Sequence, residues 1–401
     1  MALHTGRHFL QIPGPTNVPD RVLRAMDMPT IDHRGPEFAE LGLRVIEGSK
    51  KIFKTEQPVI IYPSSGTGAW EAAIVNTLSP GDKVLMAETG QFATLWRNLA
   101  EKFKLQVDFI PGDWRHGASA EQIEARLKAD KTHEIKAVMV VHSETSTGCI
   151  SDIPAVRKAI DNVKHPALLL VDAISSLGSV EYEHDAWGAD VTVSCSQKGL
   201  MLPPGLGFNA VSDKALATAK KNSSIRSYWD WHEIIAANKL GSWVYTPATN
   251  MLYGLEVAIE MLLEEGLDNV FTRHKRHSAA SRAAARIWEL DVLCQETAAH
   301  SPILTAIMMP DGHDADRFRK VVLDKFDMSL GSGLGKVKGK IFRIGHIGHF
   351  NDLMLMGTLA GVEMGLDLAG IPHRAGGVLA AMDILKRSEV IPMSQPRTAV
   401  A

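Results

Sequence analysis

The chain has 401 residues, of which 45% are hydrophobic and 22% charged, and its formal net charge is -3 at pH 7. This composition is typical of a globular protein with a large core, and the length suits two domains better than one. The small net charge excludes an electrostatic basis for binding nucleic acid or an anionic membrane.

Targeting and membrane signals are not evident in the sequence. Residues 1–8 lack the apolar core of a signal peptide, and the C-terminal Thr-Ala-Val-Ala is not a peroxisomal address. The most apolar late segment, 353–368, is interrupted by Glu363 and Asp367, so we expect a packed helix there rather than a membrane span. The chain has three widely spaced cysteines without metal-ligand spacing (Cys149, Cys195 and Cys294). This usage favours a reduced, cytoplasmic compartment.

Residues 1–20 are rich in proline and glycine and are interpreted as an extended N-terminal arm. Such an arm either lies on a neighbouring subunit or frays, and the residues leave both alternatives open. Residues 32–37 interrupt helical patterns on either side. His33 and Arg34 in this segment fit a solvated loop as well as the lining of a site.

Residues 59–78 indicate a strand, a turn of small residues and a helix. The apolar run 59–62 predicts the strand, and the apolar spacing within 69–78 predicts the helix. Ser65, Gly66 and Thr67 would present N–H groups and hydroxyls at the helix N-terminus, where the helix dipole favours an anion. The lysine of the nucleotide phosphate loop is absent, so a nucleoside triphosphate is not indicated. Taken alone, the turn also fits a plain helix cap.

The chain continues with strands that alternate with helices, and this alternation predicts an α/β fold with a mostly parallel sheet covered on both faces. The expected strands are 83–87, 137–142 and 167–172. One helix is expected to begin at Gly90, and two more are expected at 120–130 and 155–162. Ligands of such sheets bind beyond the carboxyl ends of the strands. Polar clusters at 64–67, 143–148, 172 and 196–198 all follow strand ends, which predicts a site there. Phe92 also follows a strand end, where its ring would stack on a flat ligand or fill the core.

Lys198 follows the predicted strand 191–195, and residues 200–207 after it are not expected to form a regular element. Burial lowers the pKa of an amine and makes it a nucleophile towards aldehydes, although a lone lysine also fits an exposed loop. Asp172 ends an apolar strand, and a buried carboxylate needs a positive or hydrogen-bonding partner. A pyridinium N–H would serve, and a helix N-cap is the alternative. An anion cradle, a stacking ring, an acid for the ring nitrogen and an imine-forming lysine are what pyridoxal phosphate requires.

The chain resembles the class V group of fold-type I aminotransferases, and within it the serine–glyoxylate and alanine–glyoxylate aminotransferases. The matching stretches are Pro13-Gly-Pro-Thr-Asn, Ser65-Gly-Thr-Gly-Ala-Trp-Glu, His142-Ser-Glu-Thr-Ser-Thr-Gly, Leu170-Val-Asp-Ala-Ile-Ser-Ser-Leu-Gly, Ser194-Cys-Ser-Gln-Lys-Gly, Pro203-Pro-Gly and Arg343-Ile-Gly. They follow family order over nearly the whole chain, which makes the resemblance more specific than any single motif.

The resemblance implies pyridoxal 5'-phosphate as cofactor and a role for each matched residue. Lys198 would form the imine with the cofactor, and Asp172 would pair with the pyridine nitrogen. Gly66, Thr67 and Gln197 would contact the cofactor phosphate, and Thr145 would contact the phenolic oxygen. Thr246 and Tyr245 would reach the phosphate of the neighbouring subunit. Arg343 would bind the substrate carboxylate. Alanine-specific relatives place tryptophan on the ring and histidine beside the phosphate; this chain has Phe92 and Thr67, which favours the serine–glyoxylate branch.

Arg343 lies in a predicted strand, 340–344, where a guanidinium would bind a carboxylate through two parallel hydrogen bonds or form a surface ion pair. The preceding glycine-rich run 331–339 lacks dinucleotide-binding spacing and is expected to be a loop. No acid or cysteine completes a metal set with His346 and His349, so we expect no metal. The aromatic cluster 228–231 fits either packing or a pocket wall.

We expect a large cofactor-binding domain at 21–268 and a smaller α+β domain at 269–401, in which Arg343 closes over the cleft. The small domain would contain a helix from Arg273 to Leu290, strands at 303–309 and 340–344, and helices at 315–325 and 352–369. The resemblance implies a homodimer with sites at the subunit interface.

The expected reaction is ping-pong transfer of the amino group of L-serine to glyoxylate, giving hydroxypyruvate and glycine. Alanine–glyoxylate, ureidoglycine–glyoxylate and phosphonate aminotransferases of the same fold remain alternatives. A cysteine desulfurase needs a nucleophilic cysteine on a C-terminal loop, and residues 295–401 contain no cysteine. A non-enzymatic scaffold would not need Lys198, Asp172 and Arg343 together.

Overall fold

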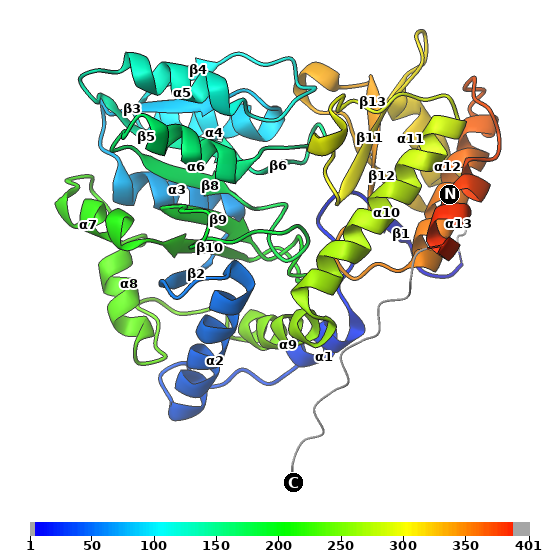
Figure 1. Ribbon diagram of the computed structural model, residues 1–401. Helices are drawn as coiled ribbons and strands as arrows, with labels where there is room; N and C mark the ends of the chain where they lie inside the picture. Colours follow the sequence, from blue (N-terminus) through cyan, green and yellow to red (C-terminus); the bar gives the residue numbers. More distant parts are fainter. Residues whose placement is uncertain (1–4, 388–401) are drawn as a thin grey trace.

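A computed structural model describes residues 5–387, which form a large sheet domain and a smaller domain joined by a long helix (Figure 1). Residues 1–4, at the start of the predicted arm, and residues 388–401, which include the C-terminal Thr-Ala-Val-Ala, lie outside the described residues. Within 5–387, no helix combines the length and apolar character needed to cross a bilayer.

The large sheet has seven strands in the order β2-β10-β9-β8-β5-β3-β4. Its strands are β2 (Val59–Pro63), β3 (Lys83–Ala87), β4 (Gln106–Ile110), β5 (Ile135–Val141), β8 (Leu168–Asp172), β9 (Val191–Cys195) and β10 (Leu206–Val211). β10 runs antiparallel to both its neighbours, whereas the pairs among β3, β4, β5, β8 and β9 are parallel. The mostly parallel α/β sheet is therefore confirmed, with β10 as the exception. β10 begins at Leu206, so the last two residues of the expected irregular segment 200–207 belong to a strand.

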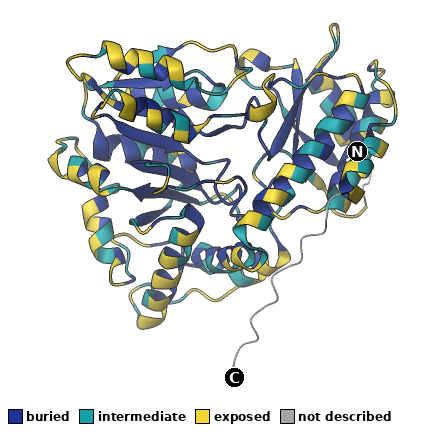
Figure 2. Ribbon diagram, viewed as in Figure 1, coloured by how far each residue is buried: buried dark blue, intermediate teal, exposed yellow. Residues whose placement is uncertain are grey.

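Both faces of this sheet are buried because most of its strands alternate their apolar side chains between two cores. In β5, Val138 and Val140 enter one core, while Ala137 and Met139 enter the other. The first core is covered by α1 (Asp20–Met26), α2 (Pro36–Phe53), α5 (Ala120–Ala129), α6 (Ile153–Asn162) and α9 (Thr249–Glu265). The second is covered by α3 (Gly66–Thr77), α4 (Gln91–Lys102), α7 (Asp213–Lys221) and α8 (Trp231–Asn238). Figure 2 shows the buried strands between helices whose outer faces are exposed.

The smaller domain packs four helices on a four-stranded sheet with the order β1-β12-β13-β11. The strands are β1 (Phe9–Gln11), β11 (Leu304–Met308), β12 (Met328–Ser332) and β13 (Ile341–Gly345). The helices are α10 (Leu267–Ile287), α11 (Ala315–Phe326), α12 (Asp352–Leu368) and α13 (Gly377–Arg387). Short elements elsewhere are β6 (Ser143–Glu144), β7 (Cys149–Ile150) and two 3-10 helices, η1 (Thr297–Ala299) and η2 (Gly335–Val337).

The N-terminal arm lies on its own chain, because β1 pairs in parallel with β12 of the smaller domain. The arm then passes from the smaller domain to the edge of the large sheet, where the backbone N–H of Thr16 donates to the carbonyl of Gln197 (3.1 Å). The arm is therefore ordered within its own subunit from residue 9 onwards, which the sequence alone did not predict.

Helix α10 belongs to both domains. Val270 and Phe271 near its start lie in the large-domain core, whereas Ala280 and Ala284 lie in the core of the smaller domain. The expected helix from Arg273 to Leu290 thus begins at Leu267 and ends at Ile287. We place the domain boundary within α10, which Figure 1 shows running from near α9 to the smaller domain.

Candidate active site

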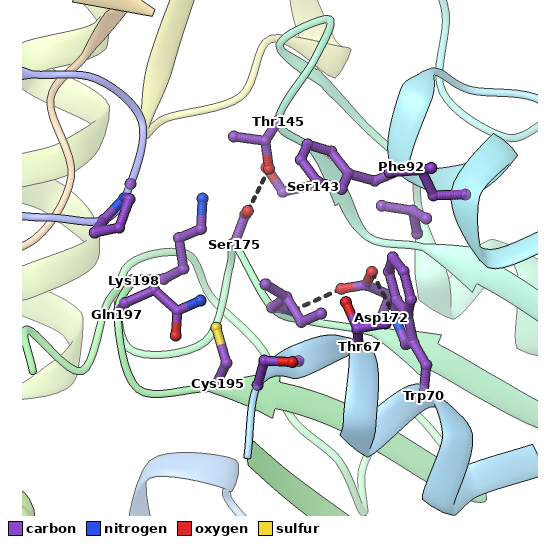
Figure 3. Close-up of a pocket in the computed structure, with 17 residues that line it drawn as sticks. Thr67, Trp70, Phe92, Ser143, Thr145, Asp172, Ser175, Cys195, Gln197 and Lys198 are labelled. Carbon is purple, nitrogen blue, oxygen red and sulfur yellow. Dashed lines mark hydrogen bonds between the residues drawn. The ribbon is translucent and has the colours of Figure 1, made fainter. Parts of the chain in front are cut away.

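A cavity of about 250 Å³ lies at the carboxyl ends of the parallel strands. Its lining comes from the arm (Gly14, Pro15), the turn after β2 and the start of α3 (Ser65, Gly66, Thr67, Trp70), the start of α4 (Phe92, Leu95), the end of β5 and the segment after it (Val141, Ser143, Thr145), the end of β8 (Asp172, Ile174, Ser175) and the end of β9 (Cys195, Gln197, Lys198). The predicted convergence of strand ends thus corresponds to a real cavity. Figure 3 shows Lys198 and Asp172 at this same cavity.

Lys198 lies in the turn that follows β9, and only 8% of its surface is exposed. Its Nζ donates a hydrogen bond to the carbonyl oxygen of Pro13 in the arm (2.7 Å). Burial lowers the pKa of Lys198 to about 8, and the nearby Arg343 acts in the same direction, against the raising effects of Cys195, Asp172 and Glu144. An amine with this pKa is partly neutral near physiological pH and can act as a nucleophile or a base.

The arm holds Lys198 through an unusually close backbone approach at Gly14. The φ angle of Gly14 is +114°, and a Cβ atom there would lie 2.5 Å from Lys198 Nζ. Thr16 adds a hydrogen bond from its Oγ1 to the carbonyl oxygen of Lys198 (3.2 Å). Only glycine fits position 14 without strain or displacement of the lysine side chain.

A Gly14→Ala variant should therefore fold but lose at least about tenfold in turnover, because the added methyl group displaces Lys198. The positive φ angle should also cost the variant about 1–3 kcal/mol of stability. The measurement is steady-state turnover together with the thermal midpoint. Gly81→Ala is the matched control: Gly81 also has a positive φ (+95°), and a Cβ there would meet open space. Equal losses of turnover in the two variants would contradict a specific contact with Lys198.

Asp172 is the last residue of β8 and is 3% exposed. Its Oδ1 accepts a hydrogen bond from the backbone N–H of Ile174 (2.7 Å), and its Oδ2 accepts one from Trp70 Nε1 (3.1 Å). Burial raises the pKa of Asp172 to about 7, while the hydrogen bonds from Ile174 and Trp70 oppose the rise. No helix follows Asp172, so its carboxylate caps a turn rather than a helix. A cationic N–H in the cavity would favour its ionised form.

The start of α3 lies at the cavity, where the sequence predicted either a plain helix cap or an anion cradle. Ser65 is the N-cap and accepts from the backbone N–H of Gly68 (3.4 Å), while Gly66 and Thr67 form the first turn of the helix. The side-chain oxygen of Gln197 is buried without a hydrogen-bond partner among the described residues. A side-chain amide without a fixed partner can turn its NH₂ group towards an anion. The helix N-terminus and these polar side chains together fit a phosphate group.

Phe92, Thr145 and Ser175 lie on the other side of the cavity (Figure 3). The carboxylate of Glu144 accepts from the backbone N–H groups of Phe92 (3.3 Å) and Ala93 (3.1 Å), and so fixes the start of α4. The hydroxyls of Thr145 and Ser175 hydrogen-bond to each other. Phe92 thus presents an apolar ring and Thr145 a hydroxyl to the same space. With Lys198, Asp172 and the cradle, they provide the groups that bound pyridoxal phosphate needs.

Arg343 borders the cavity without lining it. It lies on β13 between Gly331 and Ala306 of the adjacent strands, and a Cβ at Gly331 would lie 3.2 Å from its Nε. Its Nη1 donates to the carbonyl oxygen of Thr145 (2.6 Å), and its Nε donates to that of Ser332 (2.8 Å). Burial lowers the pKa of Arg343 to about 10, so the guanidinium remains charged at neutral pH. Arg343 is therefore a cation of the smaller domain placed at the edge of the cavity.

Several residues singled out in the sequence lie away from this cavity. Tyr245 and Thr246 are exposed, and the ring of Tyr245 stacks on Tyr228 (ring centroids 4.8 Å apart). In the aromatic cluster, Trp229 and Trp231 pack against or bond to Tyr62, so packing describes their role. His33 and Arg34, which fitted a site lining, and His346 and His349 are likewise absent from the lining. Among the described residues, no cluster of His, Cys, Asp and Glu fits a metal ion.

Other lining residues were not assigned to the site from the sequence, notably Gly14, Pro15, Trp70 and Ser175. Trp70 is one helical turn beyond the cradle, so its spacing from Thr67 was a usable signal. Ser175 follows Asp172 by three residues and is the first of two consecutive serines. No local pattern indicated that the arm would reach Lys198.

Comparisons with known proteins show which proteins this chain resembles. The profile of the family described as "Aminotransferase class-V" matches residues 8–334. The chain is 47% identical to a serine–glyoxylate aminotransferase of Methylorubrum extorquens, over 96% of this chain and 97% of the relative. It is 44% identical to an L-aspartate–glyoxylate aminotransferase of Paracoccus denitrificans, over 94% of this chain and 96% of the relative.

A solved structure supports the same fold. The ureidoglycine–glyoxylate aminotransferase of Bacillus subtilis superposes with a TM-score of 0.87 at 28% identity. The match covers 96% of this chain and all (100%) of that structure's chain.

Proposed function

This chain belongs to the class V aminotransferase family, and from that premise we propose that it transfers the amino group of L-serine to glyoxylate, giving hydroxypyruvate and glycine. The enzyme uses pyridoxal 5'-phosphate. When bound, this cofactor supplies an aldehyde that takes up the amino group and a ring that withdraws electrons from the α-carbon.

The side chains of the cavity divide the remaining work. We assign Lys198 the covalent attachment of the cofactor and the transfer of the α-proton, because its amine is partly neutral near pH 8. Asp172 would hold the proton of the ring nitrogen, and Ser65, Gly66, Thr67 and Gln197 would hold the phosphate. Phe92 would cover the ring, and Thr145 would contact its phenolic oxygen.

The observation that carries the choice of substrate is the distribution of positive charge. Among the described residues that line the cavity, Lys198 is the one cation, and Arg343 adds one more at the edge. Arg343 can hold one carboxylate, as serine and glyoxylate require. A donor with a second carboxylate, such as aspartate, would need a further cation for it. This arrangement supports a small monocarboxylate donor.

The test is a panel of amino donors measured against glyoxylate: L-serine, L-alanine, L-aspartate, ureidoglycine and a 2-aminoalkylphosphonate. We expect L-serine to have the highest kcat/KM and aspartate to be weak. The panel separates the proposal from the alanine, ureidoglycine and phosphonate alternatives, because these share the cofactor groups and differ in the donor they accept. A higher kcat/KM for any other donor would reject serine as the preferred substrate.

Replacing Arg343 with alanine should raise KM for both L-serine and glyoxylate by about 10- to 100-fold, since one charged hydrogen-bonding partner of each carboxylate is lost. The KM values of Arg343→Lys should lie between those of the wild type and those of Arg343→Ala, because an ammonium keeps the charge but cannot form two parallel hydrogen bonds. Arg319→Ala is the control: Arg319 also donates to a carbonyl oxygen of β12, that of Leu330 (2.7 Å), and does not line the cavity. An unchanged KM for both substrates in Arg343→Ala would contradict its role.

We further propose a cytoplasmic homodimer in which Thr246 and Tyr245 reach the phosphate cradle of the neighbouring subunit. Both residues are exposed and lie away from the cavity of their own chain. Large hydrophobic residues are exposed in the same part of the chain (Ile225, Tyr228, Leu240, Val244 and Tyr245). Sedimentation should give about twice the mass of one chain, and Thr246→Ala should weaken cofactor binding. A monomer with full activity would reject this arrangement.

A further inference from the structure

The carboxylate of Asp172 has a side-chain partner that the catalytic assignment does not use. Trp70 Nε1 donates to Asp172 Oδ2 at 3.1 Å, while the backbone N–H of Ile174 donates to the other oxygen at 2.7 Å. Each carboxylate oxygen therefore has one protein donor, and each keeps a lone pair for a further partner. Figure 3 shows the indole beside Asp172 on the wall of the cavity.

Trp70 is held firmly in this position. It is 3% exposed, and its ring stacks on that of Trp96 with centroids 5.7 Å apart and planes 12° apart. Trp70 lies on α3, the helix that begins with the anion cradle, and Trp96 lies on α4, the helix that begins with Phe92. The stacked pair thus joins the two helices that present the cradle and the apolar ring.

We propose that Trp70 is a positioning residue whose indole N–H fixes the orientation and favours the ionised form of Asp172, and thereby strengthens the hold of Asp172 on the ring nitrogen of the cofactor. This inference rests on the proposed role of Asp172 and adds a second residue to it. Trp70 acts through Asp172 rather than on the substrate.

The environment explains why a donor is needed there. Asp172 is buried, and the charge of Glu144 raises its pKa further, so the surroundings favour the protonated acid. A protonated acid offers a poorer acceptor to a ring N–H than a carboxylate does. The indole has a single N–H and no acceptor, so it stabilises the carboxylate without competing for its remaining lone pairs.

The experiment compares Trp70→Phe with Trp96→Phe in the full-length enzyme. Both substitutions remove the same atoms from one stacked pair, but the N–H of Trp96 is buried without a hydrogen-bond partner among the described residues. Trp96→Phe therefore reports the loss of packing alone.

The dissociation constant of pyridoxal phosphate should rise at least about fivefold more in Trp70→Phe than in Trp96→Phe. The pH at which the visible absorbance band titrates should rise only in Trp70→Phe, because a less firmly protonated ring nitrogen withdraws fewer electrons.

A cofactor analogue with C–H in place of the ring nitrogen completes the test. Because this analogue offers Asp172 no N–H, wild type and Trp70→Phe should bind it within about twofold of each other, as expected for a coupled pair with one partner removed. Equal effects of Trp70→Phe and Trp96→Phe, or the same loss with the analogue as with pyridoxal phosphate, would overturn the proposal. Should Trp70→Phe not fold, Trp70→His takes its place, because its imidazole keeps a ring N–H. For each variant, the loss of affinity for pyridoxal phosphate is compared with the loss of affinity for the analogue. The proposal requires the difference between these two losses to be smaller in Trp70→His than in Asp172→Asn, and an equal difference overturns it.

Asp172→Asn separates a failure of this inference from a failure of the proposed function. If Asp172→Asn abolishes the preference for pyridoxal phosphate over the analogue and Trp70→Phe does not weaken it, the ring-acid role stands and the inference about Trp70 fails. If Asp172→Asn leaves that preference unchanged, the ring-acid role fails, and the inference fails with it.

Discussion

An enzyme with Lys198 replaced by alanine is expected to lack the visible absorbance band of the attached cofactor and to lose turnover by at least about 10⁴-fold. Under the proposed roles, two functions would disappear with this amine: the attachment of the cofactor and the transfer of the α-proton. Among the described residues that line the cavity, no other carries an amine. An absorbance spectrum of the purified variant measures the loss of the band, and a fixed-time assay with L-serine and glyoxylate measures the loss of turnover.

The same variant leaves the carbonyl oxygen of Pro13 without its donor, so loss of fold must be separated from loss of chemistry. Lys214→Ala is the matched control, because Lys214 also donates to a backbone carbonyl, that of Ala167 (2.8 Å), away from the cavity. Added methylamine should restore a fraction of the activity of Lys198→Ala, since a small amine can take the place of the missing base. Normal turnover or a retained band in Lys198→Ala would reject the assignment.

The arrangement of strand ends could be predicted from the sequence because it depends on short-range patterns. The apolar runs that end at Asp172 and before Lys198 predict buried strands, and the carboxyl ends of parallel strands meet at one edge of a sheet. The structure places both residues at a single cavity for this reason. The start of α3, which we propose as the anion cradle, could be predicted from the small residues of the turn before it.

Other features depend on contacts between distant segments, which no local pattern reports. The approach of Gly14 to Lys198 joins residues 184 positions apart, and the sequence indicated only that the arm was extended. The reversed direction of β10 depends on how the chain returns after Pro203 and Pro204, and the turn residues do not fix it. Trp70 had the spacing of a core residue, and its bond to Asp172 depends on the side-chain geometry of two helices and a strand.

Replacing Asp172 with asparagine should lower turnover by about 10²- to 10³-fold and weaken cofactor binding, because a neutral amide cannot balance a protonated ring nitrogen. The two residues have nearly the same shape, so the cavity should keep its volume. One of the two donors, Ile174 or Trp70, loses its acceptor oxygen, and this adds a constant cost to stability that does not vary with pH. Turnover and the equilibrium dissociation constant of pyridoxal phosphate give the two measurements.

The pH dependence of stability tests the same residue without any catalysis. Burial raises the pKa of Asp172 to about 7, whereas an unfolded aspartate has a pKa of about 3.9. Between these values the folded chain binds the proton more tightly than the unfolded chain does. The stability from this group is therefore fully present below about pH 4 and is lost as the pH rises through about 7.

In the cofactor-free protein, the thermal midpoint of the wild type should thus fall relative to that of Asp172→Asn between pH 5 and about pH 8. Bound cofactor should remove the difference in slope, because a cationic ring N–H then compensates the carboxylate. Parallel pH profiles for the two cofactor-free proteins would show that Asp172 does not titrate in this range, and its assignment as the ring acid would lose its electrostatic basis.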